Sequence, residues 1–234
     1  MKSIKINFLQ KRYDFVESTN ETAKSFVTSG APEVTAIVAS QQAAGKGRHG
    51  NTWTSPKGNL YCSIILHPAD RGTPLARYGQ LAFVVGNAVA KVLKNLSPTL
   101  PITLKWPNDV LLDGRKLCGI LIEVEGDAAI VGIGMNIQSS PVVSTYATTY
   151  LCNHVDKPVE VEEILEQILV LIGEKYESWI ENGFDPVRTE WLSHAHHYGE
   201  TIVRAGIQGR FIGIDDDGRL LIQQSDGIIV KMIS

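Results

Sequence analysis

Six consecutive residues, "GKGRHG" at positions 45–50, combine glycines with basic side chains in a way that suits anion binding. Glycines let successive backbone N–H groups turn toward one point, and Lys46 and Arg48 add positive charge, which is typical of a phosphate site. A mobile basic surface loop explains these residues equally well, because short runs of this composition are common by chance. Taken alone, the segment raises a phosphate-binding hypothesis without deciding it.

The same six residues also match the dinucleotide-binding pattern G-x-G-x-x-G. That pattern needs a helix beginning at its third glycine and an acidic residue about 20 positions later to bind the ribose. Here the chain continues "NTWTSPKGN", in which Pro56 and Gly58 oppose a helix, and the acidic residue is missing. The sequence therefore argues against an NAD-binding site.

A second segment, "LKWPNDVLLDGRKLCGILIE" at residues 104–123, places charged groups inside an otherwise apolar stretch. The letters "WPND" interrupt a strand pattern, and Asp113-Gly114 predicts a tight hairpin turn shortly afterwards. The returning strand brings Lys116 back toward Asn108 and Asp109. We therefore expect these three side chains to lie close together.

The elements that must position the basic loop are predicted on both sides of it. Ser18 and Glu21 have the spacing of a capping box and indicate the start of a helix. Apolar runs at residues 34–40 and 60–66 predict two buried strands, which leave the polar stretch 41–59 as a long loop between them. Loops of that length inside a domain are usually functional.

Between the predicted strand 60–66 and the C-terminal unit, the sequence pattern predicts further helices and hairpins. A long helix is expected from Pro74 to Leu93, another over residues 159–181, and a shorter one in "PVRTEWLSH". Consecutive hairpin turns at residues 113–114 and 126–127 imply an antiparallel or mixed sheet. The predicted class is α+β, with a mixed, largely antiparallel sheet flanked by helices.

The residue pattern changes after about His197, where short apolar runs alternate with glycine and aspartate turns. This pattern predicts a small all-β unit that packs on the preceding part for want of a sufficient core of its own. We expect one domain over residues 1–195 and a C-terminal domain over residues 196–234.

Several motifs occur in the order found in one known family. "STN" at residues 18–20, "GKGRHG-x-x-W", "KWPNDV", a lysine before "GILIE", and "GIGMN" follow one another between residues 18 and 137. In this respect the chain resembles the biotin protein ligases. The C-terminal unit is similar to the SH3-like β-barrel of that family, so the resemblance extends over nearly the whole chain.

The resemblance implies a fold like that of class II synthetases and a reaction in two steps. The carboxylate of biotin attacks the α-phosphate of ATP and releases pyrophosphate, giving biotinyl-5'-AMP. A lysine of a biotin carboxyl carrier protein domain, part of a biotin-dependent carboxylase, then takes the biotin. Residues 1–195 would be the catalytic domain that binds biotin and ATP.

Three residues are the catalytic candidates that the resemblance implies. Lys116 matches the family lysine between the biotin carboxylate and the α-phosphate, although an exposed hairpin lysine is the alternative. Arg48 matches the basic position of the loop that covers the adenylate. Asp109 has the acidic position of its motif, where it would orient Lys116, help the acceptor amine lose its proton, or only cap a turn.

The ligand-binding candidates belong to the same motifs. We expect biotin contacts from the early segment and apolar walls, and nucleotide contacts from the loop and later glycines. The predicted set is Ser18, Thr19, Asn20, Gln41, Gly45, Lys46, Gly47, Arg48, His49, Gly50, Trp53, Lys105, Asn108, Lys116, Gly119, Ile120, Gly134 and Asn136. Trp53 could equally be a core residue, and "GIGMN" a plain strand end.

Magnesium is expected with ATP, since the departing pyrophosphate needs its charge neutralised. No carboxylate cluster in the sequence points to a protein-held metal site, so we expect the phosphates of ATP to coordinate the ion. The spacing of His194, His196 and His197 is a weak ligand pattern, and a domain junction explains it more simply.

Composition and the N-terminal sequence argue against DNA binding, secretion and membrane insertion. The formal net charge of −3 offers no basic field for DNA, and Ser18 leaves 17 residues before "STN", too few for a winged-helix domain. The N-terminus lacks the apolar core of a signal peptide, and no run suits a membrane span. Three widely spaced cysteines favour free thiols and a reducing, cytoplasmic location. Exposed edges of the hairpin sheet would allow a homodimer.

Two other functions are alternatives. A lipoate or octanoate protein ligase of the same fold would also couple a small acid to a protein lysine, but the "R-R-x-x-G-G-G" pattern of lipoate ligases is absent. A non-catalytic biotin sensor would keep the fold without turnover. The presence of both Lys116 and Arg48 argues against a sensor.

Overall fold

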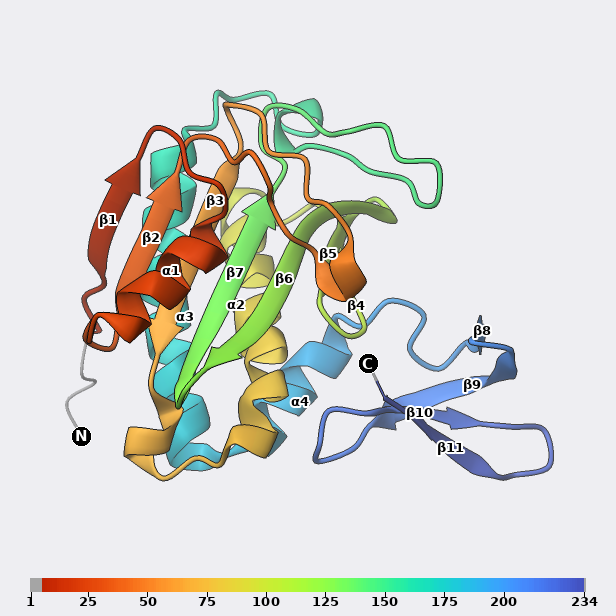
Figure 1. Ribbon diagram of the computed structural model, residues 1–234. Helices are drawn as coiled ribbons and strands as arrows, with labels where there is room; N and C mark the ends of the chain where they lie inside the picture. The colour runs from red at the N-terminus through yellow and green to blue at the C-terminus, as the bar shows by residue number, and fades with distance from the viewer. Residues whose placement is uncertain (1–5, 234) are drawn as a thin grey trace.

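Continuous apolar runs of the sequence become the central strands of a sheet whose two faces are covered. In the computed structural model, which describes residues 6–233, every residue of β3 is buried. The seven-stranded sheet has the order β1-β2-β3-β7-β6-β5-β4 (Figure 1). Its strands are β1 (Leu9–Tyr13), β2 (Thr35–Ala39), β3 (Leu60–Leu66), β4 (Ile102–Lys105), β5 (Asp109–Leu112), β6 (Arg115–Glu125) and β7 (Ala128–Met135).

All neighbouring strands of this sheet run antiparallel except β1 and β2, which are parallel. The predicted mixed, largely antiparallel sheet is thus confirmed. Asp113 and Gly114 have φ values of 53° and 70°, as a tight hairpin turn between β5 and β6 requires. β1 itself was not predicted, because alternation over a short exposed segment is a weak signal.

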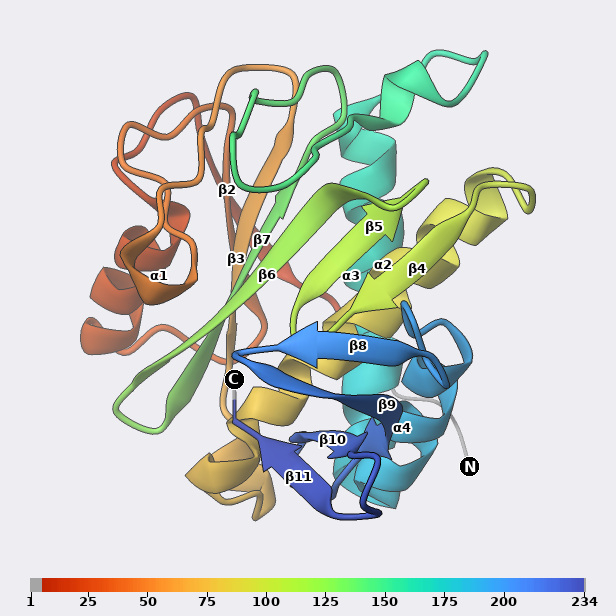
Figure 2. The same ribbon diagram turned by 90° about the vertical axis from the view of Figure 1, so that its right-hand side faces the viewer.

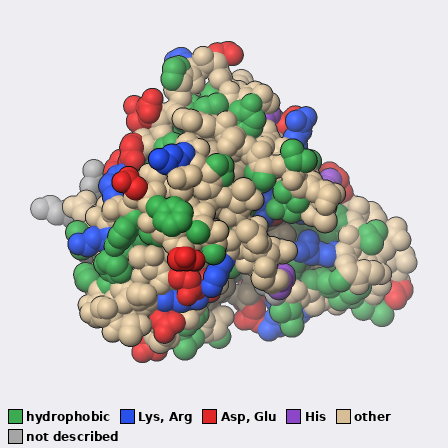
Figure 3. Space-filling view, turned by 45° about the horizontal axis from the view of Figure 1, so that its top comes forward, with side chains coloured by type: hydrophobic (Ala, Val, Ile, Leu, Met, Phe, Trp, Pro, Cys, Tyr) green, Lys and Arg blue, Asp and Glu red, His purple; other side chains and the backbone are tan. Residues whose placement is uncertain are grey.

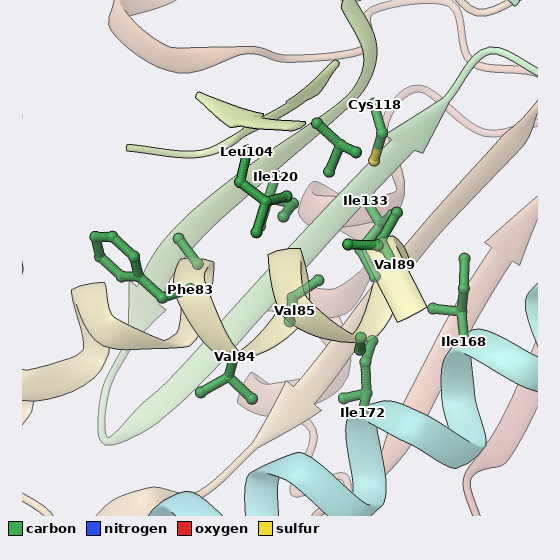
Figure 4. Close-up of a cluster of buried hydrophobic side chains, with 14 of the residues drawn as sticks. Phe83, Val84, Val85, Val89, Leu104, Cys118, Ile120, Ile133, Ile168 and Ile172 are labelled. Atoms are coloured by element: carbon green, nitrogen blue, oxygen red, sulfur yellow. The ribbon is translucent and has the colours of Figure 1, made fainter. Parts of the chain in front are cut away.

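Helices cover both faces of the sheet. Helix α1 (Thr19–Thr28) lies on one face, whereas α2 (Leu81–Leu96) and α3 (Val161–Asn182) cover the other, and α4 (Phe184–Ser193) packs against both of these (Figures 1 and 2). The main core lies between α2, α3 and the sheet, where Val85 and Val89 meet strand residues such as Ile133 (Figure 4). The helix predicted over residues 159–181 is confirmed.

Helix α1 begins next to Ser18 as predicted, but its predicted capping and the predicted start of α2 were wrong. Residues 75–80 form a 3-10 turn and α2 begins only at Leu81, because Gly79 weakens the first turn. The capping box of α1 does not form: Ser18 occupies the N-cap position without a side-chain hydrogen bond. Glu21 instead binds Lys24 and Lys46, whose positive charges compete with a backbone N–H for its carboxylate.

The C-terminal part forms the predicted all-β unit. Its four antiparallel strands have the order β11-β10-β9-β8 and comprise β8 (Thr201–Arg204), β9 (Ile207–Ile214), β10 (Leu220–Gln223) and β11 (Ile229–Met232). This unit docks on the first sheet, since Trp106 Nε1 donates to the Gly218 carbonyl at 2.8 Å. The boundary after residue 195 stays a prediction.

Further expectations concern thiols and membranes. All three cysteines are free, as predicted; Cys62 and Cys118 are buried, whereas Cys152 is half-buried. Burial raises the pKa of Cys62 to about 12, so its thiol stays neutral. Within residues 6–233, no helix is both long and apolar enough to cross a bilayer.

Candidate active site

A cavity of about 460 Å³ opens between strands β5–β7 of the seven-stranded sheet and the loop 45–53, and Arg204 of the C-terminal unit also lines it. The space-filling view shows this face hollowed beside the C-terminal lobe, with Lys and Arg side chains in the hollow (Figure 3). One side, which we call the strand wall, is formed by Asp109, Lys116 and their neighbours on β5 and β6. The opposite side, the loop wall, consists of residues 45–53. Thr19, Asn20, Gln42 and the underlying Ser63 form the pocket floor.

The strand wall carries an ion pair. Lys116 Nζ lies 2.8 Å from Asp109 Oδ1, and the two side chains are only 18% and 20% exposed. A bulge between Val110 and Leu111 shifts the register of β5 against β6 and brings the two residues together. Asp109 Oδ1 is sealed from solvent and makes no hydrogen bond of regular geometry to residues 6–233, so the charge of Lys116 is what compensates it.

The backbone of Lys116 is fixed on both sides. Besides its place in β6, its N–H donates to the Ala147 carbonyl at 2.9 Å and its carbonyl accepts from Thr149 N–H at 3.0 Å. The ammonium also lies 5.4 Å from the ring centroid of Trp53 and 5.2 Å from that of Tyr146. These aromatic faces stabilise its charge. Lys116 is therefore a preorganised cavity cation, and the alternative of an exposed hairpin lysine was wrong.

Arg48 reaches into the cavity from the loop wall. Its Nη1 donates to Asn108 Oδ1 at 3.3 Å, which links the loop to the "WPND" turn. Burial lowers the pKa of the guanidinium and the charge of Asp109 opposes that change. Arginine still stays protonated at any physiological pH. The structure thus brings Arg48, Asn108, Asp109 and Lys116 to one cavity, as the sequence predicted.

Lys46 is held differently from Arg48. Its Nζ donates to Glu21 Oε1 at 2.7 Å, and both side chains are nearly half exposed. Lys46 lines the cavity, yet its charge is already paired with helix α1. In this arrangement Lys46 anchors the loop wall rather than presenting a free cation.

Trp53 packs across the cavity on glycines of the sheet. A Cβ at Gly134 would lie 2.5 Å from Trp53 Nε1, and one at Gly119 would lie 3.0 Å from the same ring. The two glycines face each other on β6 and β7, so only their lack of side chains admits the indole. Trp53 Nε1 is buried without a hydrogen-bond partner among the described residues. A ligand oxygen could satisfy this donor.

The pocket floor is a buried polar network. Thr19 N–H and its hydroxyl both approach Gln42 Oε1, at 2.8 and 3.1 Å. Ser63, which is fully buried, contacts Thr19 Oγ1 at 2.7 Å and Asn20 Oδ1 at 2.5 Å. Buried polar groups that are so connected are held in fixed orientations. This floor can recognise a ligand with matched donors and acceptors.

Fourteen of the eighteen predicted ligand residues line the cavity, and Gln41, Gly45, Gly50 and Asn136 do not. Gln42 takes the place in the floor that was expected of Gln41. Asn136 is buried and donates to the Thr149 carbonyl, so it supports the segment beside Lys116. Gly45 permits a close approach instead, because a Cβ there would lie 2.4 Å from the Trp53 carbonyl oxygen.

Sequence reasoning missed several residues of the cavity. Arg204 comes from β8 of the C-terminal unit and stacks over Trp106, with Cζ 4.7 Å from the ring centroid. Burial and the nearby charge of Arg48 lower its pKa. Tyr146 lies in a segment of irregular structure. No short motif marks either residue, since their approach depends on docking of distant segments.

The charge of the lining is one-sided. Among the described lining residues Asp109 is the single carboxylate, against five basic side chains, Lys46, Arg48, Lys105, Lys116 and Arg204. No group of three or more His, Cys, Asp or Glu side chains within residues 6–233 could hold a metal ion. The cavity therefore suits a strongly anionic ligand, and its one carboxylate is already paired.

Comparisons with known proteins agree with this geometry. Residues 13–138 match the sequence profile of the biotin/lipoate A/B protein ligase family, and residues 202–234 match the biotin protein ligase C-terminal domain. A biotin–[acetyl-CoA-carboxylase] ligase of Paracoccus denitrificans is 36% identical over 207 residues, covering 82% of this chain and 85% of that protein.

Two further relatives extend the similarity to almost the whole chain. The bifunctional ligase/repressor BirA of Bacillus subtilis is 31% identical over 231 residues, covering 92% of this chain and 70% of that protein. A solved structure of a biotin protein ligase from Aquifex aeolicus, in complex with biotin and ATP, is 30% identical with a TM-score of 0.83. The superposition covers 97% of this chain and 96% of that one.

Proposed function

Because the chain belongs to the biotin/lipoate A/B protein ligase family, as a biotin protein ligase, we propose that it activates biotin with ATP as biotinyl-5'-AMP. It then transfers biotin to a lysine of a biotin carboxyl carrier protein domain. One observation carries this proposal: the half-buried Lys116–Asp109 pair faces Arg48 across a cavity rich in basic side chains.

The first step joins two anions. An oxygen of the biotin carboxylate forms a bond to the α-phosphorus of ATP, and the bond from that phosphorus to the bridging oxygen breaks. Pyrophosphate leaves with the electron pair. Lys116 supplies a fixed positive charge that reduces the repulsion between the reactants and stabilises the charge of the transition state. Arg48 closes from the loop wall over the phosphate.

The second step consumes the mixed anhydride. The amine of the acceptor lysine attacks the biotinyl carbonyl carbon, and the bond from that carbon to the phosphate oxygen breaks. AMP leaves with the electron pair, and the new amide nitrogen loses its proton to solvent. We assign Asp109 the task of orienting Lys116 in both steps, since its Oδ1 is sealed beneath that ammonium. The C-terminal unit places Arg204 at the same cavity, so the acceptor would meet residues of both sheets.

Magnesium is proposed to enter with the nucleotide. The cavity lining gives it no protein site, because Asp109 is its single carboxylate and is paired with Lys116. The residues thus do not fit a resident metal, and no role of this chain depends on one.

A homodimer formed by pairing of two chains through an exposed edge of the sheet also stays a prediction.

Pyrophosphate exchange tests the proposed function. The protein, with ATP, magnesium and biotin, should incorporate labelled pyrophosphate into ATP and should biotinylate an acceptor domain. Lipoate and octanoate replace biotin in parallel reactions. Exchange that depends on lipoate or octanoate would overturn the substrate, and biotin binding without any exchange would identify a non-catalytic sensor.

A further inference from the structure

The carboxamide of Asn20 is clamped in the pocket floor. Asn20 is 4% exposed and lies in the first turn of α1. Its Nδ2 donates to Glu123 Oε2 at 2.6 Å, and its Oδ1 lies 2.5 Å from Ser63 Oγ. Gly132 sits against it, since a Cβ there would be 2.4 Å from Oδ1. The side chain therefore has one position between β6, β7 and β3.

Glu123 decides which way that carboxamide faces. A carboxylate only accepts hydrogen bonds, so the NH₂ group of Asn20 must point to Glu123 and its oxygen to Ser63. The opposite orientation would bring two oxygens within 2.6 Å. Ser63 must then donate its single proton to Asn20. One N–H of Asn20 and one lone pair of its oxygen stay available to a ligand.

Glu123 is itself held by charge. Lys24 Nζ donates to Glu123 Oε1 at 2.6 Å and to Glu21 Oε1 at 2.9 Å. Burial lowers the pKa of Lys24, but its hydrogen bonds to the two carboxylates outweigh burial and raise it overall. Glu21 also binds Lys46 of the loop wall. A chain of opposite charges thus joins β6, α1 and the loop.

We propose that Glu123, which does not line the cavity, is a positioning residue for the ligand. It fixes Asn20 so that this side chain offers one donor and one acceptor to a cyclic urea such as that of biotin. The inference rests on the proposed function, because it takes the occupant of the floor to be biotin. Glu123 acts through Asn20 and has no part in the chemistry of ATP.

Kinetics of Glu123→Gln test the proposal. The amide keeps the shape but loses the charge, and it can present NH₂ to Asn20, so the orientation of Asn20 is no longer fixed. The KM for biotin in pyrophosphate exchange should rise on the order of tenfold, as for a lost charge-assisted hydrogen bond. The KM for ATP and kcat should stay within about twofold.

Glu125→Gln is the matched control. It makes the same change of charge two residues along β6, and Glu125 forms no side-chain hydrogen bond or ion pair within the described chain. Its kinetics should equal those of the wild type within about twofold. An equal rise in the KM for biotin in both variants would overturn a specific role of Glu123.

A double-mutant cycle separates positioning from general structural support. If Glu123 acts through Asn20, Glu123→Gln should change the KM for biotin by less than about twofold in an Asn20→Ala background. Full additivity of the two changes would overturn the proposal, as would equal rises in the KM values for biotin and ATP.

Two further outcomes are informative. If the wild type exchanges pyrophosphate with biotin and Glu123→Gln matches it, the proposed function stands and the role of Glu123 falls. If the wild type fails with biotin, both the proposed function and the role of Glu123 are wrong.

If Glu123→Gln does not fold, Glu123→Asp replaces it, because this change retracts the carboxylate by one methylene. Its KM for biotin should show the same selective rise, and wild-type kinetics for Glu123→Asp would overturn the proposal.

Discussion

Lys116 and Arg48 face the same cavity from two walls that hold them in different ways. On the strand wall, Lys116 has backbone partners on both sides and an ion pair 18–20% exposed. On the loop wall, Arg48 has one side-chain hydrogen bond, to Asn108 at 3.3 Å. Rigid strands position groups precisely enough for chemistry, whereas loops can open and close over a ligand. Under the proposed function, this difference predicts that the strand wall promotes bond formation and that the loop wall retains the adenylate.

The largest effect is expected on the strand wall. Lys116→Ala should slow formation of the adenylate by ~10²-fold or more, because it removes the fixed charge between two reacting anions. Rapid-quench measurement of the single-turnover rate gives this value. Arg115→Ala, at the exposed neighbouring position of β6, is the control and should stay within about twofold. A Lys116→Ala rate near that of the wild type would remove Lys116 from the reaction.

A smaller effect is expected on the loop wall. Arg48→Gly should raise the dissociation rate of biotinyl-5'-AMP by about 10- to 100-fold, the scale of a lost charge-assisted hydrogen bond. Its free energy of unfolding should change by no more than about 1 kcal/mol, since the one side-chain hydrogen bond of Arg48 within the described chain is long at 3.3 Å. Chase experiments with unlabelled ligand measure the rate, and an unchanged rate would contradict retention by this wall.

The contact between the two walls gives a prediction about stability. Gly134→Ala should lower the free energy of unfolding by ~1–3 kcal/mol, because its Cβ would lie 2.5 Å from the Trp53 ring. Urea unfolding measures the change. In a Trp53→Ala background the same substitution should cost less, since its clash partner is gone. An equal loss in both backgrounds would show that Trp53 does not rest on this glycine.

The smallest effect is expected at the anchor of the loop wall. Lys46→Met removes the ion pair with Glu21, in which both side chains are more than 40% exposed. Such pairs contribute at most about 1 kcal/mol, so retention of the adenylate should fall by less than about fivefold. The same chase experiment compares Lys46→Met with Arg48→Gly. A larger effect for Lys46→Met would exchange the roles of the two basic residues.

Much of the fold was predictable because local signals were strong. β3 matches the apolar run 60–66, and the turn at Asp113-Gly114 correctly placed Lys116 beside Asp109. The predictions for the start of α2 and the capping of α1 were wrong, because the local spacing of residues indicates neither the 3-10 turn nor the lysines that compete for Glu21.

From the residue pattern alone, only groups on one hairpin could be placed together, whereas Arg48, Trp53 and the other loop residues entered the predicted site through the family resemblance. Asn108, Asp109 and Lys116 lie on one hairpin, so their approach follows from its turn. Glu123 reaches Asn20 across 103 positions of sequence, and Arg204 arrives from another sheet. Gln42 instead of Gln41 faces Thr19 because loop residues lack the periodicity that assigns strand residues to a face. Such contacts depend on tertiary docking.

The different roles of the two walls are tested most directly by measuring two rates for one variant of each wall. Adenylate formation and adenylate dissociation are measured for Lys116→Ala and Arg48→Gly under the same conditions. We predict that Lys116→Ala mainly slows formation and Arg48→Gly mainly speeds dissociation. If Lys116→Ala forms the adenylate at the wild-type rate, or if both variants change both rates equally, the walls do not divide the reaction in this way.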